Sequence, residues 1–182
     1  RHAVPAAWGG HYERPSLAAL CAVREALAAA SPLADAVFAL QALGSMPITL
    51  SGNETQQRAW LPRVAAGEAV AAFAMTEPDA GSDVAAMTTR ARRDSYGWVL
   101  DGRKHLISNA GIADFYTLFA QTEDGAGAKG IACFVVPSEA QGLRFAGAQV
   151  LSEPHPLGEI VMHDCRVPND ACLGGPGEGF KL

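Results

Sequence analysis

Residues 64–75 read VAAGEAVAAFAM, and the hydrophobic pattern of the chain changes within this stretch. Up to about residue 69, alanine and leucine recur at helical spacing. Gly67 stands where a helix would end, because glycine readily adopts the left-handed conformation of a C-cap. From Val70 to Met75 the chain is a short continuous apolar run, which is typical of a buried strand. The stretch therefore divides a helical part, residues 1–69, from a β-rich part.

Three helices are predicted in the helical part. Ser16 can cap the first helix, which Ser31-Pro32 ends. A second apolar stripe ends around Gly44–Pro47, since glycine and proline are poor helix formers. Asn53 followed by Gln56 has the pattern of a capping box and opens the third helix.

Beyond residue 69 the chain favours short strands separated by Gly, Asp and Pro turns. Tyr96-Gly97 and Asp101-Gly102 are expected turn corners. Many short strands at this spacing favour an antiparallel barrel or sandwich rather than alternating β/α units. We therefore expect an α+β fold, with a helical N-terminal segment and a β middle domain over 70–170. The predicted strands are 70–75, 85–93, 98–100, 104–108, 115–121, 130–136 and 159–167.

Composition and charge argue against several classes of protein. Of the 182 residues, 49% are hydrophobic and 18% charged, which is ordinary for a globular chain and too apolar for disorder. The net charge of -5 argues against nucleic acid, because phosphate binding needs a basic patch. The densest basic run, Arg90, Arg92 and Arg93, is interpreted as a solvated face.

The four cysteines are scattered without a C-x-x-C pair, and the histidines lack metal-ligand spacing, so no metal site is predicted. Free thiols indicate a reducing compartment, and we expect a cytoplasmic protein, or one of the mitochondrial matrix if it is eukaryotic. No signal-peptide pattern and no apolar run of about 18 residues is apparent, so no membrane segment is predicted.

Gly125-Ala126-Gly127-Ala128-Lys129-Gly130 spells G-x-G-x-x-G, a pattern of dinucleotide-binding loops. That motif binds pyrophosphate only where a helix follows it, because the helix N-terminus holds the phosphates. Here the strand-like run 131–136 follows. A hairpin loop is the better interpretation, with nucleotide binding as the alternative.

Two polar segments are candidates for a site. Residues 76–83 carry three carboxylates but lack the ligand spacing of a calcium loop. Pro78, Gly81 and the short polar residues suit a tight turn whose N–H groups point into one space, or an ordinary surface turn. Residues 104–111 form a strand that ends in a polar turn. His105 there alternates with apolar neighbours, as a side chain with a structural role would.

Several motifs follow one another in a fixed order along the β-rich part. They are MTEPDAGSD at 75–83, DGRK at 101–104 leading into ISN at 107–109, DCRVP at 164–168 and GEGF at 177–180. In order and spacing these motifs resemble the acyl-CoA dehydrogenases. The helical part resembles the same family through WGG at 8–10 and GNETQQRAWLP at 52–62. The resemblance therefore covers nearly the whole chain.

The resemblance implies a subunit of three domains: N-terminal helical, middle β and C-terminal four-helix. This chain is then expected to hold part of the first domain in residues 1–69 and the second in 70–170. Residues 171–182 would be a linker and the start of the third domain, whose remainder is absent here. The family's catalytic base, a glutamate, lies in that third domain, so no catalytic residue is assigned within this chain.

The implied reaction is the FAD-dependent α,β-dehydrogenation of an acyl-CoA thioester. A carboxylate removes the α-proton while the β-hydrogen leaves as hydride to flavin N5, and the electrons pass to an electron-transfer flavoprotein. Members of the family are usually homotetramers or homodimers. The expected cofactor is FAD, and the expected substrate is an acyl-CoA.

By match to the family motifs, residues 73–82 lie along the flavin. Backbone groups of Phe73 and Met75, and both the backbone and the hydroxyl of Thr76, would face its pyrimidine edge. Gly81 and Ser82 match positions near the cofactor phosphate, and Ser82 also matches a position near the CoA portion of the substrate.

The second implied cofactor segment is 106–108. The backbone N–H of Leu106 would face the C4 oxygen of the flavin, and the Ser108 hydroxyl would hydrogen-bond N5, with Ile107 between them. The alternative for Thr76 and Ser108 is that their hydroxyls only cap turns, as those of Ser and Thr often do.

The chain departs from the family pattern at two places that bear on its reaction. Many relatives carry Trp at the position of Leu106, where the ring covers one face of the flavin. Residues 152–158 are compact where several relatives have a longer stretch with an Arg. The leucine at 106 keeps open a flavin oxidase or monooxygenase on the same fold. The expected absence of the domain that carries the base keeps open a non-catalytic fragment or assembly module.

Overall fold

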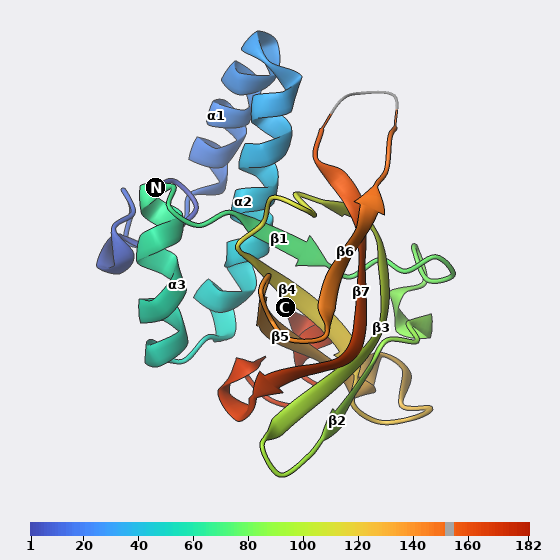
Figure 1. Cartoon of the computed structure of the whole chain (residues 1–182). Coiled ribbons are helices and arrows are strands. Elements are labelled where there is room, and N and C mark those ends of the chain that lie inside the picture. The colour runs from blue at the N-terminus through green and yellow to red at the C-terminus, as the bar shows by residue number, and fades with distance from the viewer. Residues whose placement is uncertain (152–154) are drawn as a thin grey trace.

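The structure is a computed structural model that describes residues 1–151 and 155–182. Figure 1 shows three helices gathered at one side of a sheet of eight strands, whose curved strands form the rest of the molecule. The fold is α+β, with the helices first in the chain and the strands after them, as the sequence predicts.

The helices begin and end largely at the residues that the sequence predicts. They are α1 (Leu17–Ala30), α2 (Pro32–Ser51) and α3 (Glu54–Ala66). The Ser16 hydroxyl accepts a hydrogen bond from the Ala19 N–H at 3.3 Å, which confirms the first cap. Asn53 and Gln56 exchange hydrogen bonds of 2.7 and 2.9 Å, which confirms the capping box.

Helix α2 runs past its predicted end at Gly44–Pro47 and stops only at Ser51, so that boundary is wrong. The physical reason is packing against strand β1 (Ala71–Ala74). A Cβ atom on Gly44 would lie only 2.9 Å from the Cβ of Ala71, so the glycine permits a close helix–strand approach. This tertiary contact outweighs the low helix propensity of the segment.

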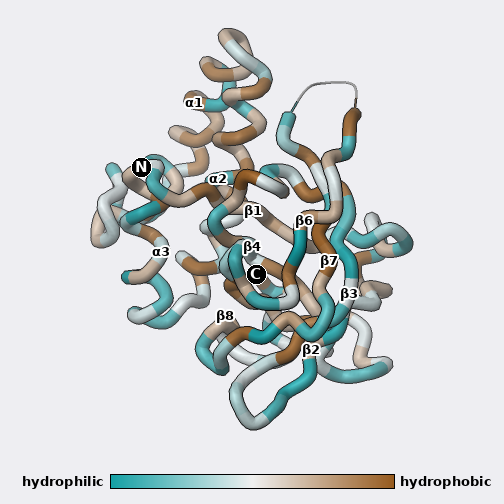
Figure 2. The backbone as a smooth tube through the Cα atoms, in the orientation of Figure 1, coloured by the Kyte–Doolittle hydropathy of each residue, from teal (hydrophilic) through white to brown (hydrophobic). Residues whose placement is uncertain are grey.

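By length and composition alone, α2 is apolar enough to cross a membrane, which the sequence analysis did not anticipate. Its hydropathy averages 1.4, and 22% of the window is buried. The helix contacts α1, α3 and β1, and most of its residues are partly rather than fully buried. Figure 2 shows hydrophobic stretches along both α1 and α2, where the pair extends beyond the sheet.

The sheet is continuous, and its strands follow the order β6-β7-β3-β2-β4-β5-β8, with β1 beside β4. Most neighbours are antiparallel, whereas β4 pairs in parallel with β1 and with β2. The later strands are β2 (Arg90–Arg93), β3 (Gly97–Ser108), β4 (Phe115–Gln121), β5 (Ile131–Pro137), β6 (Leu143–Ala148), β7 (Leu157–Pro168) and β8 (Cys172–Leu173).

Several strands differ from the sequence prediction. Residues 98–108 form one long strand, and Asp101-Gly102 marks an irregularity in its pairing with β7 rather than a hairpin corner. Val84–Ala86 is a 3₁₀-helix instead of the start of a strand. Strands β6 and β8 were not predicted, and β8 extends the sheet beside β5 in the segment expected to be a linker.

Two hydrophobic clusters stabilise the arrangement. One cluster is built from side chains of β3, β4, β5 and β7 and includes Trp98 and Phe134. The other joins the helices to β1, β4 and β5 and includes Ile48, Leu61 and Phe119. Together they fix the position of β1 between the helical layer and the rest of the sheet.

The glycine-rich loop 125–130 connects the antiparallel strands β4 and β5, and its last four residues form a 3₁₀-helix that leads directly into β5. The interpretation as a hairpin loop is confirmed. The side chains of Arg90, Arg92 and Arg93 are exposed, as predicted, and Arg92 pairs with Asp164 at 2.8 Å.

Candidate functional site

The two polar segments singled out in the sequence lie against each other. The N–H of His105 in β3 donates to the carbonyl oxygen of Thr76 at 2.9 Å. Past the end of β3, the side-chain amide of Asn109 donates to the Ala71 carbonyl at 2.9 Å and so ties that end to β1. Residues 75–76 and 105–109 are therefore held as one unit by hydrogen bonds between segments distant in sequence.

A buried ion pair connects the same two segments. Lys104 Nζ is 2.8 Å from Glu77 Oε1 and donates to the Met75 carbonyl at 2.9 Å. The two side chains are 0% and 3% exposed. Burial of a charge is costly unless the charge is paired and hydrogen-bonded, and here both conditions are met.

Glu77 is further held by Thr88 and Thr89. Its carboxylate accepts from the Thr88 N–H at 2.6 Å, the Thr88 hydroxyl at 2.8 Å and the Thr89 N–H at 3.0 Å. Burial opposes its ionisation, but attraction to Lys104 and these hydrogen bonds outweigh burial and lower the pKa of Glu77 to about 2. Burial lowers the pKa of Lys104 to about 8, and Glu77 offsets part of that effect. Both groups are charged at neutral pH.

This pair was missed by the sequence analysis, which left residues 76–83 as a possible ordinary surface turn. No local signal indicates the pair, because Lys104 and Glu77 are 27 residues apart and meet only through the packing of β3 against the turn. A lysine that faces a core needs a carboxylate partner, and Glu77 supplies it.

Several polar groups of these two segments have no hydrogen-bond partner among the described residues. The hydroxyls of Thr76 and Ser108 are half-buried and make no hydrogen bond to those residues. The N–H groups of Thr76, Gly81 and Ser82 likewise have no acceptor there. A Cβ atom on Gly81 would meet no atom within 4 Å, so the backbone is open on that side. These donors are available to a ligand.

The remaining residues matched to the cofactor have different surroundings. Phe73 lies in β1, and its ring centroid is 4.9 Å from that of Phe119. Ile107 is 1% exposed and belongs to the core, so only its backbone could face a ligand. Gly81 and Ser82 are exposed in the turn closed by the Glu77–Ala80 bridge.

Leu106 sits in an unusual backbone conformation. Its φ is 54°, in the left-handed region that is uncommon for residues other than glycine, and its side chain is 41% exposed. The pairing of β3 with β7 shifts between Lys104 and Ile107, so Leu106 lies in a bulge. Its N–H, matched above to the flavin C4 oxygen, donates to Gln149 Oε1 at 2.8 Å.

Gln149 belongs to a polar network on the outer side of β3 that the sequence analysis did not identify. Its side-chain amide is 2.8 Å from His105 Nδ1, which is 3.1 Å from Glu159 Oε2. Arg103 forms two contacts of 2.7 Å with the Glu159 carboxylate and holds its pKa below the usual range. His105 thus has the structural hydrogen bonds expected for it.

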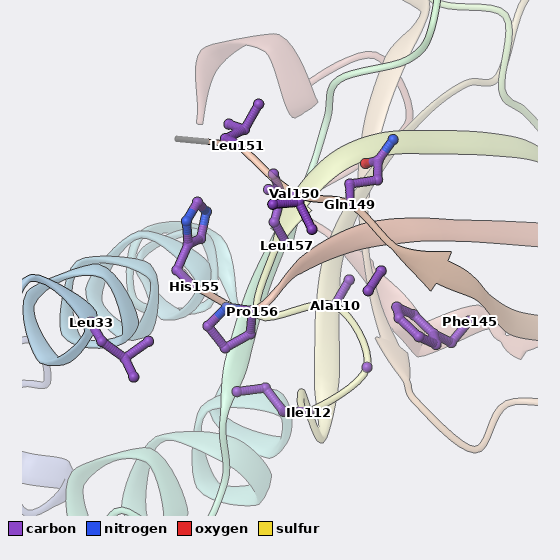
Figure 3. Close-up of a pocket in the computed structure, with 12 residues that line it drawn as sticks. Leu33, Ala110, Ile112, Phe145, Gln149, Val150, Leu151, His155, Pro156 and Leu157 are labelled. Atoms are coloured by element: carbon purple, nitrogen blue, oxygen red, sulfur yellow. The ribbon is translucent and has the colours of Figure 1, made fainter. Parts of the chain in front are cut away.

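A pocket of about 680 Å³ opens beside the end of β3. Figure 3 shows it between Leu33 of α2, the turn at Ala110 and Ile112, and the β6–β7 segment. Its walls are mainly apolar, and Gln149 is one of its polar members. None of the residues matched to the cofactor lines it, although Leu157 in its wall pairs with Ser108. Residues 152–154, part of the compact stretch noted above, lie outside the described residues.

No group of three or more His, Cys, Asp or Glu side chains within residues 1–151 and 155–182 could hold a metal ion. The four cysteines are free thiols, and burial raises the pKa of Cys165 and of Cys172 to about 11. The thiols of Cys165 and Cys172 are therefore protonated at neutral pH and are poor nucleophiles.

Comparison with known proteins gives consistent results. Residues 1–68 match the family model of the acyl-CoA dehydrogenase N-terminal domain, and residues 72–165 match that of the middle domain. A probable acyl-CoA dehydrogenase of Mycobacterium leprae is 36% identical over 180 residues. This alignment covers 98% of the present chain and 46% of the relative, so the chain spans about half the length of such relatives.

Solved structures agree. The glutaryl-coenzyme A dehydrogenase–glutaryl-CoA complex superposes with a TM-score of 0.92 at 33% identity, over 99% of this chain and 46% of that one. An acyl-CoA dehydrogenase from Bacillus anthracis complexed with FAD gives a TM-score of 0.87 at 28% identity, over 98% and 30%. The fold, the ordered motifs and both domain matches confirm the resemblance, and the chain belongs to the acyl-CoA dehydrogenase family.

Proposed function

We propose that the protein containing this chain binds FAD and removes two hydrogens from the α and β carbons of an acyl-CoA thioester. The observation that carries the proposal is the set of unpaired donors on Thr76 and Ser108, presented by two segments that the His105–Thr76 hydrogen bond holds together. Ser108 lies three residues beyond His105, at most roughly 10 Å along the strand, because the bulge at Leu106 shortens this distance. A span of that order suits a ligand made of three fused rings.

The residues present fit FAD by the chemistry of their donors. An isoalloxazine ring offers acceptor atoms along its pyrimidine edge and at N5, and the N–H and hydroxyl of Thr76 and the hydroxyl of Ser108 can donate to such atoms. The open backbone at Gly81 and Ser82 provides further N–H donors for a phosphate or for the CoA portion of a substrate.

When bound, FAD would supply the acceptor for the hydride from the β-carbon. The residues of this chain would hold and orient that acceptor, and their donors would favour the negative charge that it gains. Each donor directed at a charged acceptor contributes about 1.5–3 kcal/mol. The base for the α-proton is expected to be a glutamate of a C-terminal domain, so none is assigned among these 182 residues.

The partners proposed for the whole protein follow from its family: an acyl-CoA as substrate, an electron-transfer flavoprotein as electron acceptor and further copies of the chain in a homotetramer or homodimer. We propose a location in the cytoplasm, or in the mitochondrial matrix of a eukaryote.

The proposal is tested by titrating the full-length protein with FAD and then adding acyl-CoA thioesters of several chain lengths without oxygen. Tight binding of FAD and bleaching of its visible absorption by at least one thioester are expected, with free CoA as the control that causes no bleaching. A protein that does not bind FAD, or a bound flavin that no thioester bleaches, would contradict the proposal.

A second candidate is an oxidase or monooxygenase on the same fold, favoured by the exposed leucine at position 106, where many relatives carry a tryptophan that covers the flavin. A smaller side chain would give oxygen easier access to that face. The measurement is the rate at which the reduced protein reoxidises in air. Fast reoxidation that Leu106→Trp slows supports an oxidase, whereas slow reoxidation in both proteins supports a dehydrogenase.

A further inference from the structure

We propose that Lys104 is a positioning residue for the cofactor: anchored by Glu77, it fixes the Met75–Thr76 peptide so that the Thr76 N–H faces the flavin. This inference rests on the function proposed above and extends it to two residues that no motif match assigned to the cofactor. It concerns how the donor is aimed, since Lys104 itself is fully buried and cannot touch a ligand.

The anchor is a three-way contact. The Lys104 ammonium donates to the Met75 carbonyl at 2.9 Å and to the Glu77 carboxylate at 2.8 Å. Glu77 is itself fixed by three hydrogen bonds from Thr88 and Thr89. Lys104 therefore has little freedom to move, and the carbonyl that it binds is held with it.

The orientation of the Thr76 N–H follows from peptide geometry. In a planar trans peptide the C=O and the N–H point in opposite directions. Because the Met75 carbonyl points at Lys104, the N–H of Thr76 points away from the ion pair. The next peptide is fixed in the same way, since the Thr76 carbonyl accepts from His105 at 2.9 Å while the Glu77 N–H donates to the Ala80 carbonyl at 3.1 Å.

The charge of Lys104 also affects the donor, in addition to the position that Lys104 fixes. An ammonium on the Met75 carbonyl polarises that peptide and makes the Thr76 N–H a stronger donor. The ammonium also places a cation behind the edge at which a flavin gains negative charge on reduction. Lys104 should therefore tighten FAD binding and raise the reduction potential of the bound flavin.

The experiment uses the full-length protein with FAD and compares wild type with Lys104→Met, the double variant Lys104→Met/Glu77→Gln, and Arg92→Met as the control, because Arg92 forms an exposed ion pair with Asp164 outside the candidate site. The double variant leaves no unpaired buried charge, and such neutral replacements of buried pairs often fold well. Thermal unfolding checks the fold of each variant. The readouts are the dissociation constant of FAD, the visible spectrum of the bound flavin and its reduction potential.

We expect the double variant to fold, to bind FAD roughly 10-fold more weakly, and to have a lower flavin reduction potential, whereas Arg92→Met leaves all three readouts unchanged. A folded double variant with the affinity, spectrum and potential of the wild type would overturn the role of Lys104 while leaving FAD binding intact. An equal loss in Arg92→Met would also overturn it. Failure of the wild type to bind FAD would overturn the proposed function as well.

Discussion

Arg103 and Lys104 are consecutive residues of β3, and each pairs with a glutamate, but the two pairs have opposite surroundings. Arg103 is 58% exposed and contacts Glu159, whose side chain is 11% exposed, whereas the side chains of Lys104 and Glu77 are 0% and 3% exposed. Successive side chains of a strand point to opposite faces, so one residue belongs to a surface network and the next to the core. The contrast separates a pair that fixes the candidate site from a pair that is partly exposed to solvent at its edge.

The energetic consequences should differ accordingly. Exposed ion pairs contribute about 0–1 kcal/mol, because water screens them and the side chains lose freedom. Removal of one partner of a buried pair costs about 3–5 kcal/mol, because an uncompensated charge remains in the core. The buried pair also connects three segments, which are residues 75–77, residues 88–89 and β3. Its loss should therefore destabilise the whole turn that begins at residue 75.

The largest effect is expected for Lys104→Met, which should lower the free energy of unfolding by about 3–5 kcal/mol because it strands the Glu77 carboxylate. Urea unfolding of the full-length protein measures it, with Arg103→Met as the control. Adding Glu77→Gln should recover much of the loss. Equal losses in the Lys104 and Arg103 variants would remove the distinction between the two pairs.

The second largest effect is expected from acid, which should weaken the buried ion pair. The pKa of Glu77 is lowered from 4.5 to about 2 in the folded protein, so its stabilisation is complete above about pH 4.5 and is lost as the pH falls towards 2. The loss amounts to roughly 3 kcal/mol, at about 1.4 kcal/mol per pKa unit. Unfolding free energies compared between pH 6 and pH 3 test this, and about 2 kcal/mol of the loss falls within that range because pH 3 is still above the folded pKa. The double variant Lys104→Met/Glu77→Gln, which carries neither buried charge, should show a flatter pH dependence, and an equally steep one would count against the assignment.

Ser108 ends the strand that carries both pairs, and its hydroxyl should act on the cofactor rather than on stability. Ser108→Ala should slow flavin reduction by an acyl-CoA about 10-fold, the effect of losing one hydrogen bond of about 1.4 kcal/mol in the transition state. Anaerobic single-turnover kinetics provide the measurement. Ser95→Ala, at an exposed turn, is the control. An unchanged rate in Ser108→Ala would exclude this role.

The smallest effect is expected for Gln149, the member of the surface network whose oxygen accepts the Leu106 N–H. Gln149→Ala should leave the unfolding free energy within about 0.5 kcal/mol of wild type, as for most surface changes. It should strengthen FAD binding a few-fold, because the Leu106 N–H becomes available for the flavin oxygen matched to it. Weaker binding in this variant would show that Gln149 supports the site instead of competing for it.

Much of the fold could be predicted from local signals. Ser16, Asn53 and Gln56 define helix starts because their side chains satisfy backbone groups within the same turn. The end of α2 could not be predicted, because Gly44 continues the helix only through its close packing on β1. Likewise β8 is a two-residue strand that exists through its pairing with β5, a contact between residues distant in sequence.

The candidate site was predictable only in part for the same reason. The turn at 76–83 and the end of β3 stand out as motifs, but nothing local indicates that Lys104 turns inward to meet Glu77 or that Gln149 reaches Leu106. These contacts depend on how β3 lies against the turn on one side and against the β6–β7 segment on the other.

The most direct test of the account is a crystal structure of the full-length protein with FAD. We predict that the ring lies across the unit formed by the 75–83 turn and β3, with the Thr76 N–H and the Ser108 hydroxyl within hydrogen-bond distance of its atoms. A ring bound elsewhere, for example in the pocket lined by Leu33 and Leu157, or those two groups directed away from it, would contradict the account.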